Sequence, residues 1–192
     1  MKLSFKGWGQ MNIEEAQLDF RRAYVGGAPG VLVSGFVWLT AAIVTEGHGV
    51  ARGFMVLFIG GIFIHPVSTF LCRSLFRRSK EDAGNALAGA ALEGTVAMIG
   101  GLIASWLFIP LRADYVFAVA AIAAGTRYAL FRTIYGDRLF WVLAGLMSGL
   151  GLLAIFGRFA SVSSPAFAVA GIELFFGGLV LARHLRSRPR SM

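Results

Sequence analysis

The chain has 192 residues, of which 57% are hydrophobic and only 15% are charged, and its mean hydropathy is +0.71. Soluble domains are roughly half apolar and about a quarter charged, so this composition excludes an ordinary water-soluble domain. The net charge of +8 alone would suit a nucleic-acid partner. The positions of the basic residues instead indicate a membrane protein, and we expect no nucleic-acid partner.

Residues 1–28 form an N-terminal segment in which "MNIEEAQLDFRRAYVGG" (residues 11–27) predicts an amphipathic helix at the membrane interface. Its apolar face carries Ile13, Ala16, Phe20 and Tyr24. Asn12 and Glu15 have the spacing of a capping box, and Gly26 with Gly27 marks the helix end. Because the pattern starts at Met11, we expect residues 1–10 to be a disordered extension or the result of an upstream start codon.

Six apolar segments of about 17 to 25 residues are each long enough to cross a hydrocarbon layer of ~30 Å. The predicted spans are residues 29–46, 53–72, 86–109, 115–135, 139–157 and 166–183. The expected fold is therefore an all-α polytopic membrane protein. Its six-helix transmembrane domain covers residues 29–183, and residues 184–192 form a basic cytoplasmic tail.

The basic residues are distributed unequally between the two sides of the membrane in this topology. With the N-terminus inside, fourteen of the eighteen lysines and arginines fall in cytoplasmic segments, three fall outside, and Arg127 lies within a span. This distribution predicts that both termini are cytoplasmic. The basic loop and tail are expected to lie against anionic lipid headgroups.

Glycine pairs recur in three spans, as "FIGGIF" (58–63), "MIGGLI" (98–103) and "FFGGLV" (175–180). Glycine lets membrane helices approach closely, so these pairs predict packing seams, as does the spacing of Gly145 and Gly149. A hinge at a glycine pair is the alternative. Acidic residues precede two of the pairs, which hints at an inverted repeat of three plus three spans.

Four ionisable side chains lie inside the predicted spans, and they form the candidate site: His65, Glu93, Arg127 and Glu173. All four lie roughly 10 to 15 Å from the cytoplasmic ends of their helices. We therefore expect one buried polar cluster, in which Arg127 pairs with Glu93 or Glu173. The cluster could bind a solute or protons, or it could be a structural ion pair that fixes helix register.

His65 precedes Pro66, which should kink the second span near Gly60 and Gly61. The opened backbone would be satisfied by Ser68 and Thr69. A histidine at such a kink could exchange protons with Glu93, or it could be a neutral structural residue.

No catalytic or metal-binding motif is present in the sequence, so we expect no enzyme activity, no metal and no cofactor. The only candidate for a nucleophile with a base is Ser34 or Ser68 with His65, and these residues belong to no known catalytic motif. Cys72 is interpreted as a buried bystander. Tyr128 and Tyr135 are assigned to the aromatic belt at the span ends and given no chemistry.

Four segments resemble a family of small bacterial membrane proteins of unknown function: "LDFRRAYVGGAPGVLVSGFVWL", the proline after His65, "ALEGTVAMIGGL" and "TRYALFRTIYG". The likeness covers most of residues 11–157. It implies a six-pass protein of the bacterial cytoplasmic membrane, with no activity, substrate or functional residues to transfer.

The expected function is a small transporter or permeation protein for a polar or ionic solute, and the alternative is a non-catalytic membrane scaffold or assembly partner. Transport predicts a water-accessible cavity that reaches the polar residues. A scaffold predicts dry, mutually satisfied polar residues and an apolar helix face left for a partner. Formation of a homo-oligomer is left open by the sequence.

Overall fold

The structure, a computed structural model, describes residues 11–157 and 161–186. The predicted extension over residues 1–10 and the part of the predicted tail over residues 187–192 lie outside this range. The described chain is all-helical, as predicted. It contains seven α-helices and two short 3-10 helices: α1 (Ile13–Ala23), η1 (Val25–Gly27), α2 (Ala28–His48), α3 (Val50–Ser74), α4 (Leu87–Leu107), η2 (Ala113–Tyr115), α5 (Val116–Tyr135), α6 (Leu139–Phe156) and α7 (Ser164–Arg186).

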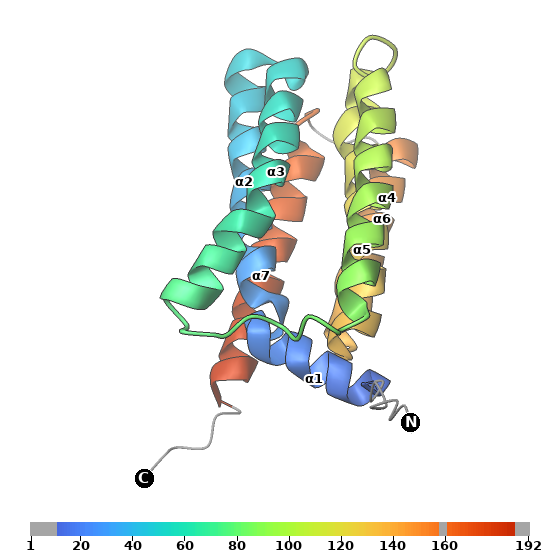
Figure 1. Cartoon of the computed structure of the whole chain (residues 1–192). Coiled ribbons are helices and arrows are strands. Elements are labelled where there is room, and N and C mark those ends of the chain that lie inside the picture. Colours follow the sequence, from blue (N-terminus) through green and yellow to red (C-terminus); the bar gives the residue numbers. More distant parts are fainter. Residues whose placement is uncertain (1–10, 158–160, 187–192) are drawn as a thin grey trace, which may run out of the picture.

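Helix α1 has the boundaries that its sequence predicts. The Asn12 side chain accepts a hydrogen bond from the Glu15 backbone N–H at 2.9 Å, and the Glu15 carboxylate accepts one from the Asn12 N–H at 3.0 Å. Gly26 and Gly27 follow with φ values of +66° and +87°, a left-handed conformation that ends the helix. Helix α1 therefore lies across one end of the bundle, here called the α1 end (Figure 1).

Five helices are long and apolar enough to cross a membrane, namely α2, α3, α4, α6 and α7. Helix α5 is the exception to the six predicted spans, because Arg127, Tyr128 and Arg132 lower its hydropathy. It is also a central helix that packs between α4 and α6, and more than half of its residues are buried. A helix shielded by its neighbours can carry polar side chains that a lipid-facing helix cannot.

The long helices form two groups of three. Helix α2 packs against α3 and α7, and helix α5 packs against α6 and α4. Figure 1 shows these groups side by side, with α1 and the loop between α3 and α4 closing one end. The two halves of the chain, α2–α4 and α5–α7, thus use the same pairing: the first helix packs on the second and on the third helix of the other half. This is the arrangement that an inverted repeat would give.

The predicted glycine seams hold for one member of each pair. The packed glycines are Gly60, Gly101 and Gly177. A Cβ atom added to Gly60 would lie 2.6 Å from a Val37 methyl group. A Cβ atom added to Gly101 would meet Ala123, and one added to Gly177 would meet Leu32. Their partners Gly61, Gly100 and Gly178 have open space instead. The same is true of Gly145 and Gly149, so the prediction that this pair packs is wrong within one chain.

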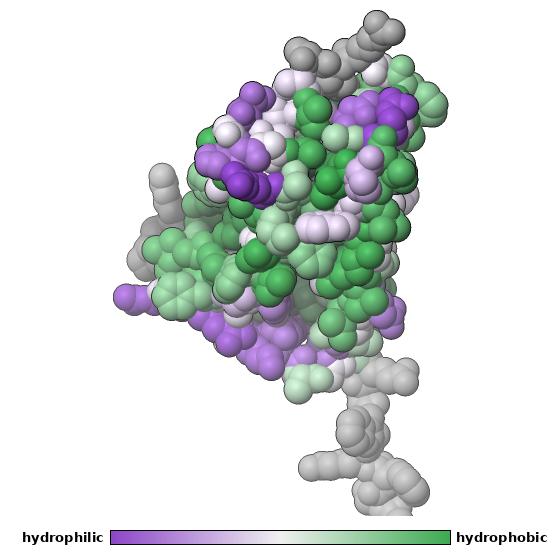
Figure 2. Space-filling model, turned by 90° about the horizontal axis from the view of Figure 1, so that it is seen from above, coloured by the Kyte–Doolittle hydropathy of each residue, from purple (hydrophilic) through white to green (hydrophobic). Residues whose placement is uncertain are grey.

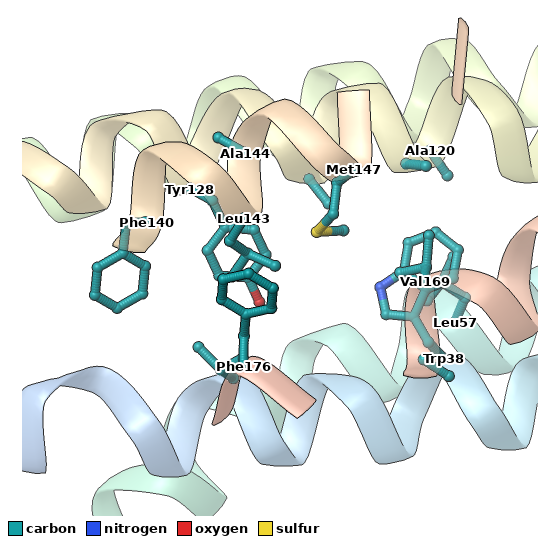
Figure 3. Packing of buried hydrophobic residues seen from close by; sticks show 14 of the residues in the cluster. Trp38, Leu57, Ala120, Tyr128, Phe140, Leu143, Ala144, Met147, Val169 and Phe176 are labelled. Atoms are coloured by element: carbon teal, nitrogen blue, oxygen red, sulfur yellow. The ribbon is translucent and has the colours of Figure 1, made fainter. Parts of the chain in front are cut away.

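Apolar side chains occupy both the core and much of the exterior. Figure 2 shows hydrophobic residues over much of the visible surface, with hydrophilic residues gathered in separate patches. The core runs between the groups, and Figure 3 shows Leu143 of α6 beside Phe176 of α7. Burial on the inside together with large exposed apolar side chains on the outside is the pattern expected of a helical bundle in lipid.

Candidate binding cavity

The two groups of helices meet closely on one side and not on the other. Helices α6 and α7 pack against each other, whereas α3 and α4, which hold the equivalent positions in the two halves, make at most marginal contact. The space beside the α3–α4 side is a cavity of about 540 Å³, here called the large cavity. Its volume falls within the ~300–1,000 Å³ typical of small-molecule sites.

The large cavity is mostly apolar, with a few polar side chains on its wall. Helix α3 contributes residues from Phe58 to Cys72, and α4 contributes residues from Ala88 to Leu102. Side chains that carry oxygen or nitrogen come from α2, α3, α4, α5 and the segments at the α1 end: Tyr24, Ser34, His65, Ser68, Glu81, Thr95, Arg127, Tyr128 and Tyr135. An apolar wall with a few convergent polar groups is the usual composition of a ligand site.

A bend in α3 widens this space. Pro66 lies inside α3, and the half of the helix toward the α1 end leans away from the second group (Figure 1). Proline has no N–H and displaces the preceding turn, which opens the backbone near Ile62. Ser68 donates a hydrogen bond to the His65 carbonyl oxygen at 3.0 Å and not to the opened carbonyl near Ile62, and the buried Thr69 hydroxyl has no hydrogen-bond partner. The prediction that these two side chains satisfy the opened backbone is therefore wrong.

His65 lies on the cavity wall just before the proline. Its side chain is exposed, and its ring centroid is 6.2 Å from that of Tyr24. The imidazole therefore faces the cavity near the α1 end. A histidine in this position can bind a polar group or exchange a proton with water that enters the cavity.

Arg127 reaches the deeper part of the large cavity from α5. One of its terminal nitrogens, Nη1, is 3.8 Å from the Met98 sulfur, and its guanidinium carbon lies 5.0 Å from the centroid of the Phe131 ring. Its buried Nε has no hydrogen-bond partner. Within the described residues the salt bridges are Arg22–Asp19 and Arg112–Asp114, so the predicted ion pair of Arg127 is wrong.

Glu173 lies behind Arg127 and is completely buried. Its Oε1 accepts a hydrogen bond from the Tyr128 hydroxyl at 2.8 Å, and its Oε2 has no hydrogen-bond partner. Glu173, Tyr128, Arg127 and Ser34 line a small cavity of about 30 Å³, which has room for about one or two water molecules. Arg127, Tyr128 and Ser34 also line the large cavity, so the two spaces adjoin.

Glu93 does not join the other three predicted residues. It is exposed and lines neither cavity, although Leu92 and Thr95 on the same helix face the large one. Each residue of an α-helix is turned by about 100° from the one before, so a position next to a lining residue points elsewhere. The structure therefore brings together His65, Arg127 and Glu173 around adjoining cavities and leaves Glu93 out of the predicted cluster.

Hydrogen bonds hold the α1 end of the cavity. The Tyr24 hydroxyl donates to the Glu81 carboxylate at 3.0 Å, and burial together with this carboxylate raises the pKa of Tyr24. Asp19 accepts hydrogen bonds from Arg22, from the Asp82 backbone and from the Asn85 side chain. Burial raises the pKa of Asp19, but these hydrogen bonds outweigh that effect and lower the pKa overall.

Tyr128 is a residue of the candidate site that the sequence alone does not indicate. The sequence predicts a place in an interfacial belt, whereas the ring is buried and the hydroxyl is the partner of the buried carboxyl group of Glu173. A signal was available, because a buried glutamate in a span requires a donor and Tyr128 lies beside Arg127. Among the described residues no group of three or more His, Cys, Asp and Glu side chains could hold a metal ion.

Comparison with known protein families gives one match. The family model described as "Family of unknown function (DUF7010)" matches residues 13–183. The chain therefore belongs to this family, in agreement with the resemblance seen in the sequence. No curated protein and no solved structure matches the chain.

Proposed function

We propose that this member of a family of unknown function is a small membrane transport protein that binds a polar or ionic solute in the large cavity. The observation that carries the proposal is the cavity of about 540 Å³ that reaches Arg127, a cation whose buried Nε is without a hydrogen-bond partner in the described structure. A scaffold would instead satisfy its intramembrane charges within the protein. A guanidinium that lines a cavity and forms no salt bridge among the described residues suits an anionic solute.

In this proposal the protein crosses the bacterial cytoplasmic membrane six times, with α5 as the sixth, shielded span. Both termini are cytoplasmic. The arrangement is supported by the basic residues Arg22, Arg78 and Lys80, because α1 and the α3–α4 loop contact each other at the α1 end. Anionic headgroups would then surround the α1 end of the bundle.

The arrangement of the two halves supports transport. Proteins built from inverted repeats bind their substrates between the repeats and expose the site by moving one part against the other. Here the cavity lies between the two groups of helices, and contact at α6–α7 with little contact at α3–α4 is the asymmetry that one such conformation would show. The bend at Pro66 accounts for the opening on the α3 side.

Glu173 and Tyr128 supply a site for coupling to protons. A carboxyl group that is fully buried beside a small cavity and has one free oxygen can gain or lose a proton as water or solute reaches it. Arg127 lies on the wall of the same small cavity. Solute binding at Arg127 would therefore alter the electrostatic environment of Glu173 directly.

The scaffold remains the second candidate, and one observation favours it. Gly145 and Gly149 on α6 have no neighbouring atoms that a Cβ would meet, so this helix face could receive a helix of another copy or of a partner. Such a surface is compatible with transport by an oligomer, but alone it would indicate an assembly role.

Water access to the cavity distinguishes the two candidates. In a Cys72→Ser background, single cysteines at Thr95, which lines the cavity, and at the neighbouring exposed Val96, which does not, would be treated with a membrane-impermeant thiol reagent in oriented vesicles. We expect labelling of Thr95→Cys from the cytoplasmic side and none of Val96→Cys. If neither position is labelled from either side, the cavity is dry and the transport proposal fails.

A further inference from the structure

We infer that the large cavity takes an amphiphile with one acidic group and a single apolar chain, which enters from the bilayer between α3 and α4. This inference depends on the proposed function, because it names the class of solute that the cavity would bind. The acidic group would contact Arg127, and the chain would lie along the apolar walls of α3 and α4.

The first argument is the position of the opening. Ile62 of α3 and Leu92 of α4 both line the cavity and are 63% and 66% exposed. They belong to two membrane-length helices that make at most marginal contact with each other. In a bilayer the cavity therefore borders the hydrocarbon layer, where an apolar chain is already dissolved and needs no transfer through water.

The second argument is the composition of the wall. A fully hydrophilic solute would leave Phe58, Ile64 and Met98 in contact with polar atoms, and burying such atoms without partners is costly. An apolar chain instead contacts these side chains favourably. A site that accepts most of its ligand through apolar surface and only its head group through hydrogen bonds matches an amphiphile.

The third argument is charge. Arg127 and His65 are the basic residues on the cavity wall. The Arg127 guanidinium contacts Met98 weakly and lies against the Phe131 ring, and among the described residues it forms no salt bridge. A carboxylate or phosphate is the group that a guanidinium binds best. The Glu81 carboxylate is held by Tyr24 at the α1 end, and Glu173 does not line the large cavity.

The size of the cavity restricts the ligand further. A volume of about 540 Å³ can hold one apolar chain with a small head group. We therefore identify the ligand class as single-chain acids from the bilayer, of which long-chain fatty acids are the simplest.

The test uses a photoactivatable palmitic acid analogue that carries a diazirine on its chain. The full-length protein would be placed in nanodiscs of zwitterionic lipid, irradiated with the probe, and digested for mass spectrometry. We expect saturable labelling of α3 and α4 peptides that excess oleate competes away. Benzoate, a water-soluble acid without a long chain, should not compete at the same concentration.

Two pairs of variants make the result specific. Arg127→Gln should reduce the labelling by about tenfold or more, because a charge-assisted contact is lost. Arg132→Gln is its control, since Arg132 lies on the same helix against Trp141 and outside both cavities. Gly61→Leu fills open space on the cavity wall and should also abolish labelling, whereas Gly145→Leu adds the same side chain outside the cavity.

The possible outcomes separate the two proposals. Labelling that is unaffected by both Arg127→Gln and Gly61→Leu would be ordinary contact with lipid and would overturn the inference. If benzoate competes as well as oleate, the cavity binds water-soluble acids, and the inference falls while the transport proposal stands. If the thiol reagent labels Thr95→Cys but the palmitic acid analogue gives no saturable labelling, the amphiphile inference is overturned and the transport proposal stands. If the thiol reagent does not label Thr95→Cys from either side, the transport proposal itself is overturned.

Discussion

The α6–α7 side and the α3–α4 side hold equivalent positions in the two halves of the chain, but they are built differently. On the first, α6 and α7 pack against each other, and both contribute buried apolar side chains to the core, among them Leu143 and Phe176. On the second, α3 bends at Pro66, and polar residues reach the cavity that remains. The comparison indicates that the missing contact on the α3–α4 side leaves the large cavity, whereas the α6–α7 side is closed by packing between its helices.

The largest effect on stability is expected from a large side chain placed where two helices pack closely at a glycine. Gly177→Leu should destabilise the protein by about 3 kcal/mol, because even a Cβ at Gly177 would lie 2.8 Å from the Leu32 side chain and 3.1 Å from its backbone nitrogen. Gly178→Leu, at the next position and with open space around it, should be close to wild type. Thermal unfolding in detergent measures both, and equal losses in the two variants would contradict the seam.

The next effect concerns the buried polar contact that joins the groups. Tyr128→Phe leaves Oε1 of Glu173 without its donor, which should cost about 1 to 2 kcal/mol of unfolding free energy. Tyr115→Phe is a control at a tyrosine outside the core cluster. Denaturant unfolding of both variants checks the prediction. A wild-type midpoint for Tyr128→Phe would show that the hydroxyl contributes nothing to stability.

A smaller change in stability is expected on the open side. Gly61→Leu should alter the unfolding free energy by no more than about 0.5 kcal/mol, because its side chain would enter empty space. The same substitution should prevent thiol labelling of Thr95→Cys. The contrast with Gly177→Leu is the direct comparison of a closed and an open interface. A large loss of stability in Gly61→Leu would mean that the cavity is not open.

The smallest effect is a dependence on pH at the α1 end. Asp19 has a lowered pKa in the folded protein, so its carboxylate contributes stability above the pKa of the unfolded chain. That contribution is lost as the pH falls through the lower, folded-state pKa. Asp19→Asn should therefore be slightly less stable than wild type at pH 6, by less than about 1 kcal/mol, and equal to it in strong acid. Melting curves across this range test the sign, which would be wrong if the difference grew on acidification.

Local chemistry explains what could be predicted. The capping box of Asn12 and Glu15 and the end of α1 at Gly26 depend on neighbours in sequence, and both are confirmed. The same holds for the position of the proline inside α3. Such features need no knowledge of which helices become neighbours.

The candidate site was predicted only in part, because it depends on rotation about helix axes and on pairing between helices. Depth in the membrane placed Glu93 with the other three ionisable residues, but its direction on α4 takes it away from both cavities. Arg127 was expected to neutralise a glutamate, whereas the partner of Glu173 is Tyr128. Residues at one depth can point in any direction around a bundle, and the spacing within one helix does not reveal its neighbours.

The sequence by itself determined the helical class of this protein, the presence of helices long and apolar enough to cross a membrane, the ends of α1, and the presence of polar residues in apolar segments. These properties follow from composition and from contacts between residues a few positions apart. The tertiary structure decided which glycines are packed, which side of the bundle stays open, and which polar residues face the same space. Those outcomes depend on contacts between residues far apart in the chain, such as Tyr128 with Glu173. Such contacts form only when the helices pack against one another.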